Sequence, residues 1–413
     1  MQNPSLFTNS RSSISGTVLT RCLDGACIEK LLLHCGSALE SNDVTLAQQV
    51  MWVLNNVASA VGDPNQRLAS YFLRALVSRA SRVCPATMSF KAAGIPHRRL
   101  MSVTELAGYV DLIPWHRFGF CASNSAILEA VRGAWGPLVE LRISVLSWRP
   151  PTPPLLNIPI EEIRQRLVNF ARYRDVPFEF NVIEVGGPLE EEEAASSSFY
   201  DFLLGQLGAA IVKVNVDEAL VVNIQNWLRY LPEEETSFSD SSCDGTMSYR
   251  DSFLELVGRL SPCLVTVVDE DCDLGAHSGL ASRIVSCFNY MWIPFDALET
   301  FLPKDNPQRI EYESDIGHKI ENIVGYEGGQ RIERLESGGR LCRRMASAGF
   351  MSVPFGEETV KEVKVLLDEH ASGWGMKKDE EGMLVLTWKG HNAVYAGAWV
   401  PRVPASHQNN LLV

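Results

Sequence analysis

Beyond its first third, the chain alternates between strand-like and helix-like stretches, and this alternation limits the folds that it can adopt. Residues 138–145 and 178–183 place apolar side chains at every second position, which is typical of half-buried strands. Residues 262–268 form a continuous apolar run, as in strands that a parallel sheet buries on both faces. Helical spacing lies between these strands, at residues 160–173 and in the second half of 219–230. The pattern predicts an α/β fold with a core sheet flanked by helices.

Both ends of the chain add to this prediction. Near the C-terminus, residues 383–388 and 393–399 are two short strands around a Gly-containing connection, and they predict an antiparallel hairpin at the edge of the sheet. Near the N-terminus, residues 28–39 and 46–57 have helical spacing, and Asp63 followed by proline suits the start of a third helix. The chain therefore opens with a bundle of helices.

One apolar strip in the second of these helices has the spacing of a heptad repeat. Two interpretations fit it: packing within the helical domain, which is favoured for so short a run, and an exposed surface for a partner or a dimer. The members of the strip, in steps of four, three and four, are Leu46, Val50, Val53 and Val57.

Composition argues against a protein that coats nucleic acid. The formal net charge is −13, whereas nonspecific affinity for nucleic acid comes from cations that neutralise phosphates. Five arginines cluster in the C-terminal third, but glutamates 333 and 336 interrupt them, so a solvated helix face is favoured over a DNA surface. These arginines are Arg331, Arg334, Arg340, Arg343 and Arg344. No apolar run approaches the roughly 20 residues of a membrane helix, and ten scattered cysteines favour reduced thiols in cytosol or nucleus.

Signatures of catalysis are missing from the sequence. We find no glycine-rich dinucleotide or phosphate loop, no nucleophile elbow and no Cys/His set with metal-ligand spacing, so we assign no catalytic, cofactor-binding or metal-binding residue. One acidic cluster, Asp269–Asp273, follows the apolar strand, where open α/β sheets bind ligands. A ribose or metal site is one interpretation. The polar end of a buried strand, before the N-terminus of a helix, is the favoured one.

Several longer segments resemble, in order, the plant GRAS family of transcriptional regulators. Residues 62–72 (GDPNQRLASYF) are similar to its first leucine-rich region, and residues 160–182 to its second. Residues 292–298 (WIPFDAL) and 316–324 (IGHKIENIV) resemble its PFYRE region, and the end of the chain resembles its SAW region. The resemblance extends from about residue 27 to 401 and is greatest to the scarecrow-like branch. The motif positions, as structural or interaction residues, are Gln66, Arg67, Pro294, Phe295, Glu327, Arg331, Arg334, Trp374, Trp388 and Trp399.

The resemblance implies an architecture and a function. It implies a Rossmann-like, methyltransferase-like core with an N-terminal helical cap, and a noncatalytic regulator in the nucleus, with the cytoplasm as a second location. Its partners would be transcription factors or other GRAS proteins, in homo- or heterodimers, with no membrane and no cofactor. DNA would be bound indirectly through these partners, with direct, sequence-specific binding as the alternative. The alternatives are an S-adenosylmethionine-dependent enzyme and a truncated, dominant-negative isoform that sequesters partners. The expected segments are a disordered tail (1–24), the cap (25–110), the core (111–403) and a second tail (404–413).

One family segment is missing from this chain. The family carries a strand of the Val-His-Ile-Ile-Asp type and a helix where residues 130–137 here join the two flanks directly. The loss removes an inner strand of a parallel sheet, so we expect either neighbouring strands with unpaired backbone groups or a sheet that closes over the gap. Because each buried unpaired group costs about 1–3 kcal/mol, we expect a marginally stable fold. A mis-spliced or mispredicted gene is the favoured explanation and a natural, dominant-negative isoform the alternative.

Overall fold

The computed structural model describes residues 25–83, 103–135, 141–147, 159–173, 176–184, 197–211, 219–232, 248–275, 279–370 and 372–402. The two predicted tails lie outside these residues. The helices are α2 (Gly25–Glu40), α3 (Val44–Val57), α4 (Pro64–Val83), α5 (Val103–Leu112), α6 (Trp115–Trp135), α7 (Ile160–Tyr173), α8 (Ser197–Ile211), α9 (Tyr249–Arg259), α10 (Leu280–Phe301), α11 (Pro307–Gly325), α12 (Gly338–Ser347) and α13 (Glu357–Asp368), with the short 3-10 helices η3 (Leu228–Tyr230) and η4 (Gly328–Gln330). The strands are β1 (Leu141–Leu146), β2 (Phe178–Ile183), β3 (Val221–Gln225), β4 (Leu264–Glu270), β5 (Phe350–Ser352), β6 (Trp374–Lys378), β7 (Leu384–Trp388) and β8 (His391–Pro401).

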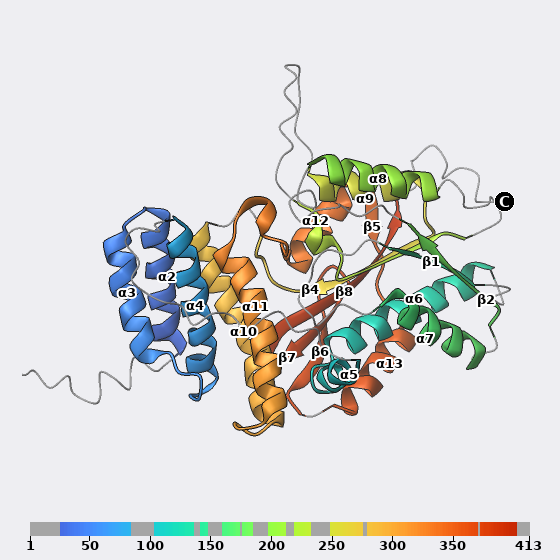
Figure 1. Ribbon diagram of the computed structural model, residues 1–413. Helices are drawn as coiled ribbons and strands as arrows, with labels where there is room; N and C mark the ends of the chain where they lie inside the picture. Colours follow the sequence, from blue (N-terminus) through green and yellow to red (C-terminus); the bar gives the residue numbers. More distant parts are fainter. Residues whose placement is uncertain are drawn as a thin grey trace, which may run out of the picture.

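Helices α2, α3 and α4 form one end of the molecule and pack against α10 and α11 (Figure 1). As predicted, Asp63 caps α4: its carboxylate accepts the Gln66 N–H at 2.9 Å, and Gln66 Oε1 accepts the Asp63 N–H at 3.1 Å. Helix α2 lies so close to α10 that a Cβ atom on Gly36 would come within 2.7 Å of Ala281 Cα. One hydrophobic core runs from these helices through α10 and α11 to the sheet. A domain boundary at residue 110 therefore stays a prediction.

The described strands form two separate sheets. Strands β1 and β2 pair in parallel, and the larger sheet has the order β3-β4-β8-β7-β6, with β5 pairing with β8. Strand β3 is parallel to β4, and β8 is antiparallel to both of its neighbours β4 and β7. Helices α6 and α13 contribute to the core on one face of the larger sheet, and α8, α9 and α12 to the core on the other. This is the mixed α/β class that the alternation predicts.

The prediction that the C-terminal hairpin lies at the edge of the sheet is wrong for both of its strands, because β7 lies between β8 and β6, and β6 forms the edge. Strand β8 lies between β4 and β7, and its residues 393–399 are buried. Its pairing with β4 places Val265 opposite Trp399. Local periodicity does not contain such long-range pairing, and a buried antiparallel strand has the same apolar pattern as a parallel one.

The described strands divide into two sheets, as expected if the inner strand is missing and its neighbours keep unpaired edges. Among the described residues, β1 pairs only with β2, and β3 pairs only with β4. Each of these strands therefore keeps an edge without a strand partner in the described part of the chain. Within the part of the chain that the structure describes, the two sheets do not join over the gap.

The strip on α3 divides between core and surface. Val50 and Val57 are 8% and 5% exposed, so the prediction of an exposed surface is wrong for them. Both belong to the buried side of α3, together with Ala47, Met51 and Leu54, and α3 packs against α2 and α4. Leu46 is 43% exposed, and Val53 is half-buried. In the described part of the chain, no helix is long and apolar enough to cross a bilayer.

A charge at a buried and at an exposed position of α3 should have different effects on stability. We expect Val50→Asp to lower the free energy of unfolding by about 2–4 kcal/mol, because it buries an unpaired carboxylate. Leu46→Asp, at an exposed position in the first turn of the same helix, should change it by less than about 0.5 kcal/mol. Urea unfolding followed by circular dichroism measures both. Equal unfolding midpoints for the two variants would contradict this assignment of the buried face.

Candidate functional site

The carboxyl end of β4 carries a group of buried charges. Asp269 and Glu270 end the strand and are 3% and 6% exposed. The Arg229 guanidinium of η3 pairs with Asp269 and donates to Glu270 Oε1 at 2.5 Å. From α11, Lys319 Nζ donates to the same Glu270 oxygen at 2.5 Å and lies 3.1 Å from Glu333 Oε2. We call these five residues the β4 charge network.

A tight turn after β3 places Arg229 in this network. Asn226 has a positive φ of 52°, a backbone conformation that asparagine tolerates better than most residues. Its N–H donates to Val268 O on β4 at 2.8 Å, and its side-chain oxygen accepts from Arg229 Nη2 at 3.0 Å. The turn thus fixes both the end of β3 and the position of the guanidinium.

The network charges stabilise one another. Burial alone would raise the pKa of Glu270, but Arg229 and Lys319 lower it to about 2. Burial alone would lower the pKa of Lys319, but Glu270 and Glu333 raise it. The pKa of Asp269 is raised, because burial outweighs the attraction of Arg229. Lys319 and Glu270 are therefore charged at neutral pH, although both are buried.

The acidic cluster is committed to contacts within the protein. Asp269 and Glu270 pair with Arg229 and Lys319, and Asp271 accepts the Gly338 N–H at 2.9 Å at the start of α12. Among the described residues, no group of three or more His, Cys, Asp or Glu side chains is placed to hold a metal. This arrangement favours the interpretation of the cluster as the polar end of a buried strand.

The arginine cluster is not one solvated helix face. Arg331 and Arg334 are 1% and 2% exposed, so that prediction is wrong for both. They lie before α12 and donate to the backbone carbonyls of Leu274 at 3.3 Å and Gly328 at 2.8 Å. Buried guanidinium groups bound to the backbone cannot neutralise phosphates. In α12 itself, Arg343 is exposed, as predicted.

Motif position Arg67 joins the cap to the core. Its guanidinium donates to Glu313 of α11 at 3.0 Å, and Nη1 lies 2.9 Å from Glu299 of α10. Glu313 Oε1 lies 3.0 Å from Arg67 Nη2 and also 3.0 Å from Arg309 Nε, so both arginines share this oxygen. The ion pairs therefore connect α4, α10 and α11. Glu313 is 4% exposed and Arg67 is 4% exposed, so neither presents a free surface.

The other motif positions also lie in structural contacts. The Trp374 and Trp388 rings are 4.7 Å apart, and Trp388 Nε1 donates to Asp296 at 2.7 Å. Phe295, next to the buried Pro294, packs edge-to-face against Tyr71. Trp399 belongs to the core beneath α9, and Gln66 caps α4. Glu327 is the exception, because 47% of its side chain is exposed, although it pairs with Arg79 at 2.8 Å. Partner binding by these residues stays a prediction.

Sequence reasoning missed an exposed tryptophan on α3. Trp52 is 62% exposed and lies on the side of the helix opposite Leu54. Leu46 is the other large apolar residue exposed on this helix. The signal was present in the sequence, since Trp52 lies two positions from Val50, about 200° around the helix. We call Leu46, Trp52 and the half-buried Val53 the α3 surface.

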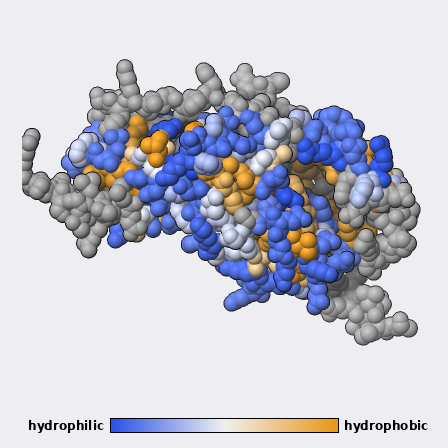
Figure 2. Space-filling view, turned by 90° about the horizontal axis from the view of Figure 1, so that it is seen from below, coloured by the Kyte–Doolittle hydropathy of each residue, from blue (hydrophilic) through white to orange (hydrophobic). Residues whose placement is uncertain are grey.

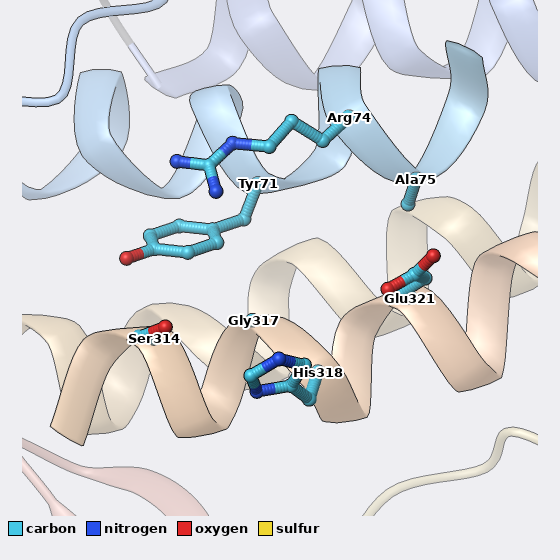
Figure 3. Close-up of a pocket in the computed structure, with 7 residues that line it drawn as sticks. All are labelled: Tyr71, Arg74, Ala75, Ser314, Gly317, His318 and Glu321. Carbon is cyan, nitrogen blue, oxygen red and sulfur yellow. The ribbon is translucent and has the colours of Figure 1, made fainter. Parts of the chain in front are cut away.

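A small pocket lies between α4 and α11 (Figure 3). Figure 3 shows Arg74 extending over the Tyr71 ring, and its guanidinium carbon lies 4.7 Å from the ring centroid. His318 and Glu321 line the opposite side, on α11. The cavity volume of about 20 Å³ suits one water molecule rather than a cofactor.

His116 lies beside the turn after β3. Its Nδ1 atom is 3.4 Å from Asn226 Nδ2, and its ring stacks on the exposed Phe120. Burial lowers the pKa of His116 to about 4, and the positive charge of Arg229 adds to this effect. The imidazole is therefore neutral at physiological pH.

Comparison with known proteins relates the chain to one family. A family model described as the GRAS domain family matches residues 28–139 and 134–400. Scarecrow-like protein 32 of Arabidopsis thaliana is 43% identical over 416 residues, which cover 93% of this chain and 96% of that protein. Protein SHORT-ROOT 1 of Oryza sativa subsp. japonica is 30% identical, over 90% of this chain and 68% of that protein. The crystal structure of SCL7 in Oryza sativa is similar with a TM-score of 0.66 and 25% identity, over 90% of this chain and 99% of that one.

Removing the central cation of the network should be strongly destabilising. We expect Arg229→Met to lower the free energy of unfolding by about 3–5 kcal/mol, because it leaves Asp269 and Glu270 buried with too little positive charge. The matched control is Arg343→Met on the exposed side of α12, which should cost less than about 0.5 kcal/mol. Urea unfolding compares the two. An Arg229→Met midpoint equal to that of the control would contradict the structural role of the network.

His116 should make stability depend on pH. The unfolded chain has an ordinary histidine pKa of about 6.5, whereas the folded value is about 4, so the unfolded state binds more protons between these values. Stability from this group is complete above about pH 6.5 and falls as the pH is lowered towards 4. We expect His116→Gln to lose less thermal stability than the wild type between about pH 7.5 and pH 5. An identical loss in both proteins would contradict the lowered pKa.

Proposed function

The chain belongs to the GRAS domain family, in its scarecrow-like branch, and we propose that it is a nuclear regulator of transcription that acts without catalysis. Its partners are other transcription factors or GRAS proteins, and it reaches DNA through them. The observation that carries this proposal is the β4 charge network: the end of the sheet where α/β enzymes bind ligands is filled by the protein's own ion pairs. The network leaves Glu270 and Asp269 no role as ligands for a ribose.

Charge supports recruitment through proteins rather than direct contact with DNA. The net charge is −13, and the buried Arg331 and Arg334 are withdrawn from the surface. A protein that holds DNA by its phosphates needs exposed cations in excess. Binding to a DNA-bound partner avoids this requirement.

We assign the partner contact to the α3 surface. Tryptophan is enriched among residues that dominate binding energy, and Trp52 is the most exposed aromatic residue of the described cap. Leu46 adds apolar area in the first turn of the same helix, and the buried Val50 and Val57 hold the helix to its bundle. Both interpretations of the heptad-like strip therefore hold in part: its buried residues pack within the helical domain, and its exposed residues bind the partner.

The finer fold that we infer is a Rossmann-like, methyltransferase-like sheet that lacks one inner strand. Three observations support it: the parallel pairs β1–β2 and β3–β4, the antiparallel β8 inserted beside β4, and helices on both faces. The missing strand belongs between β1 and β3. In an enzyme of this layout, the loop after that strand would help to bind the cofactor, so its loss also supports a noncatalytic role.

A reporter assay in plant cells tests this function. A fusion of the chain to a fluorescent protein should enter the nucleus, and tethering the chain to a reporter promoter should change transcription. We expect Leu46→Asp combined with Trp52→Asp to abolish the change, because losing a binding hot spot worth about 2 kcal/mol weakens binding about 30-fold. The matched control is Val365→Asp, an equally apolar and 54% exposed position on α13.

Two outcomes would contradict the proposal. One is a double variant that alters transcription as strongly as Val365→Asp does, provided that its thermal melt matches that of the wild type. The other is a rise in the melting midpoint on addition of S-adenosylmethionine, because a ligand that binds only the folded state must stabilise it. That rise would favour the enzyme.

A further inference from the structure

Helix α3 presents an uncharged face to the solvent. Of the α-helices that the structure describes, only α3 contains no charged side chain. Residues 44–62 include no Asp, Glu, Lys, Arg or His, although 21% of the whole chain is charged. A helix at the surface of a protein normally carries charged and polar residues on its solvent side. The exposed side of α3 is polar but neutral, and this composition limits what can bind to it.

The exposed residues of α3 include a strip in steps of four, three and four. At about 100° per residue, its members fall within about 60° of arc, opposite the buried Leu54. Leu46 and Val53 lie along one side of the strip. This spacing is that of the a and d positions in a coiled coil. We call the four exposed residues of the strip, Thr45, Gln49, Trp52 and Asn56, the α3 seam.

The seam lies at one end of the molecule. In Figure 1, α3 is at the outer end of the cap, and it packs against α2 and α4, which in turn pack against α10 and α11. Figure 2 shows hydrophobic residues between hydrophilic ones at the surface of this end. Trp52, which is 62% exposed, is the largest side chain of the seam. A second molecule can therefore contact α3 without displacing the packing of the cap.

Charge identifies the kind of partner that fits the seam. A charged side chain buried against it would find no opposite charge on α3, and an unpaired charge is costly to bury. Two copies of the chain, each with a net charge of −13, repel each other over much of their surfaces, but at α3 neither copy brings a charge. Amide side chains carry both donors and acceptors, so Gln49 and Asn56 can bond to an identical set. The seam therefore suits a second copy of itself.

The spacing of the seam is also self-complementary. Steps of four, three and four are the same in both directions, so the seam matches an antiparallel α3 of a second copy. Trp52 then lies opposite Gln49 of the second copy, and Thr45 lies opposite Asn56. The Asn56 amide donates to Trp52 O of its own helix at 2.9 Å, which leaves Asn56 Oδ1 to accept from the opposite threonine hydroxyl. Antiparallel packing also places the N-terminus of each helix dipole beside the C-terminus of the other, which is favourable.

We propose that the α3 seam binds the α3 seam of a second copy of this chain, as an antiparallel helix pair about a two-fold axis. The proposal rests on the function given above, which places partner binding on α3, and it names the partner. Helix α3 has 14 residues and is about 21 Å long, so the pair buries less than the roughly 1,200 Å² of a stable interface. The dimer is therefore transient, with a dissociation constant between about 1 µM and 1 mM.

Sedimentation equilibrium of the full chain, from about 5 to 500 µM, tests the dimer. We expect reversible association of the wild type and an affinity at least about tenfold lower for Gln49→Glu, because each copy then buries a carboxylate against Trp52 of the other. The matched control is Gln330→Glu, which adds the same charge at an exposed position of η4, outside the cap. This control should associate like the wild type. Because Gln49 and Gln330 are both exposed, both variants should keep the wild-type thermal melt.

A pair of opposite charges tests the antiparallel register. Thr45→Glu combined with Asn56→Lys leaves the net charge unchanged and places each glutamate opposite a lysine of the other copy. We expect this double variant to associate at least as tightly as the wild type at about 50 mM salt, and less tightly as added salt screens the pairs. A parallel pair would place like charges opposite each other and would dissociate.

Several results would overturn the proposal. A wild type that stays monomeric throughout the concentration range would leave the seam to a different protein. Equal association of Gln49→Glu and the wild type would place the dimer contact on another surface. Dissociation of the charge-pair variant would exclude the antiparallel register.

The reporter assay separates failure of this proposal from failure of the proposed function. If the chain is monomeric and its effect on transcription is still lost in the Leu46→Asp and Trp52→Asp double variant, α3 binds a different protein. The function then stands, and the second copy is excluded as the partner. If the chain dimerises through the seam but the double variant still changes transcription, the dimer stands and the proposed function does not.

Discussion

The mutual neutralisation of charges at the end of β4 is the constraint on which the rest of the structure depends. Asp269 and Glu270 lie where a sheet strand meets η3 and α11, and taking each ion out of water costs several kcal/mol unless it is paired. Arg229 and Lys319 must therefore come from two different elements and meet at one point. This requirement fixes α11 against the sheet. Because Glu313 of α11 in turn binds Arg67 of α4, the position of the cap depends on the same helix.

The carboxylates at the end of β4 form ion pairs within the protein, and in this respect the molecule differs from α/β enzymes. In an α/β enzyme, carboxylates after a central strand are available to a ligand, whereas here they complete an internal network. The same residues cannot serve both purposes, because a bound ribose or metal would compete with Arg229 for Glu270. The function proposed above therefore places partner binding on the exposed residues of α3, Leu46 and Trp52. A mixed α/β fold is thereby compatible with a regulatory family.

The parts of the fold that sequence could predict are those that local chemistry determines. The apolar run before Asp269, the cap formed by Asp63 and Gln66, and the family motifs all depend on residues near one another in the chain. The position of β8 could not be predicted, because it depends on pairing between Val265 and Trp399. Burial of Arg331 depends likewise on a distant carbonyl, that of Leu274. Periodicity identified the apolar strip on α3, but it did not determine which residues of the strip are buried in the helical bundle and which are exposed.

The position of β8 also bears on how the protein is made. Strand β4 needs β8 as a neighbour, and β8 is the last strand of the described chain, roughly 130 residues after β4. A ribosome adds about 5–20 residues per second, so a nascent β4 waits about 7–26 seconds before its partner is synthesised. Throughout this interval a strand that is buried along its whole length in the folded protein lacks one of its two neighbours. Until β8 is synthesised, the edge of β4 that it will cover stays available for pairing with other chains, which makes this interval the one in which aggregation competes most with folding.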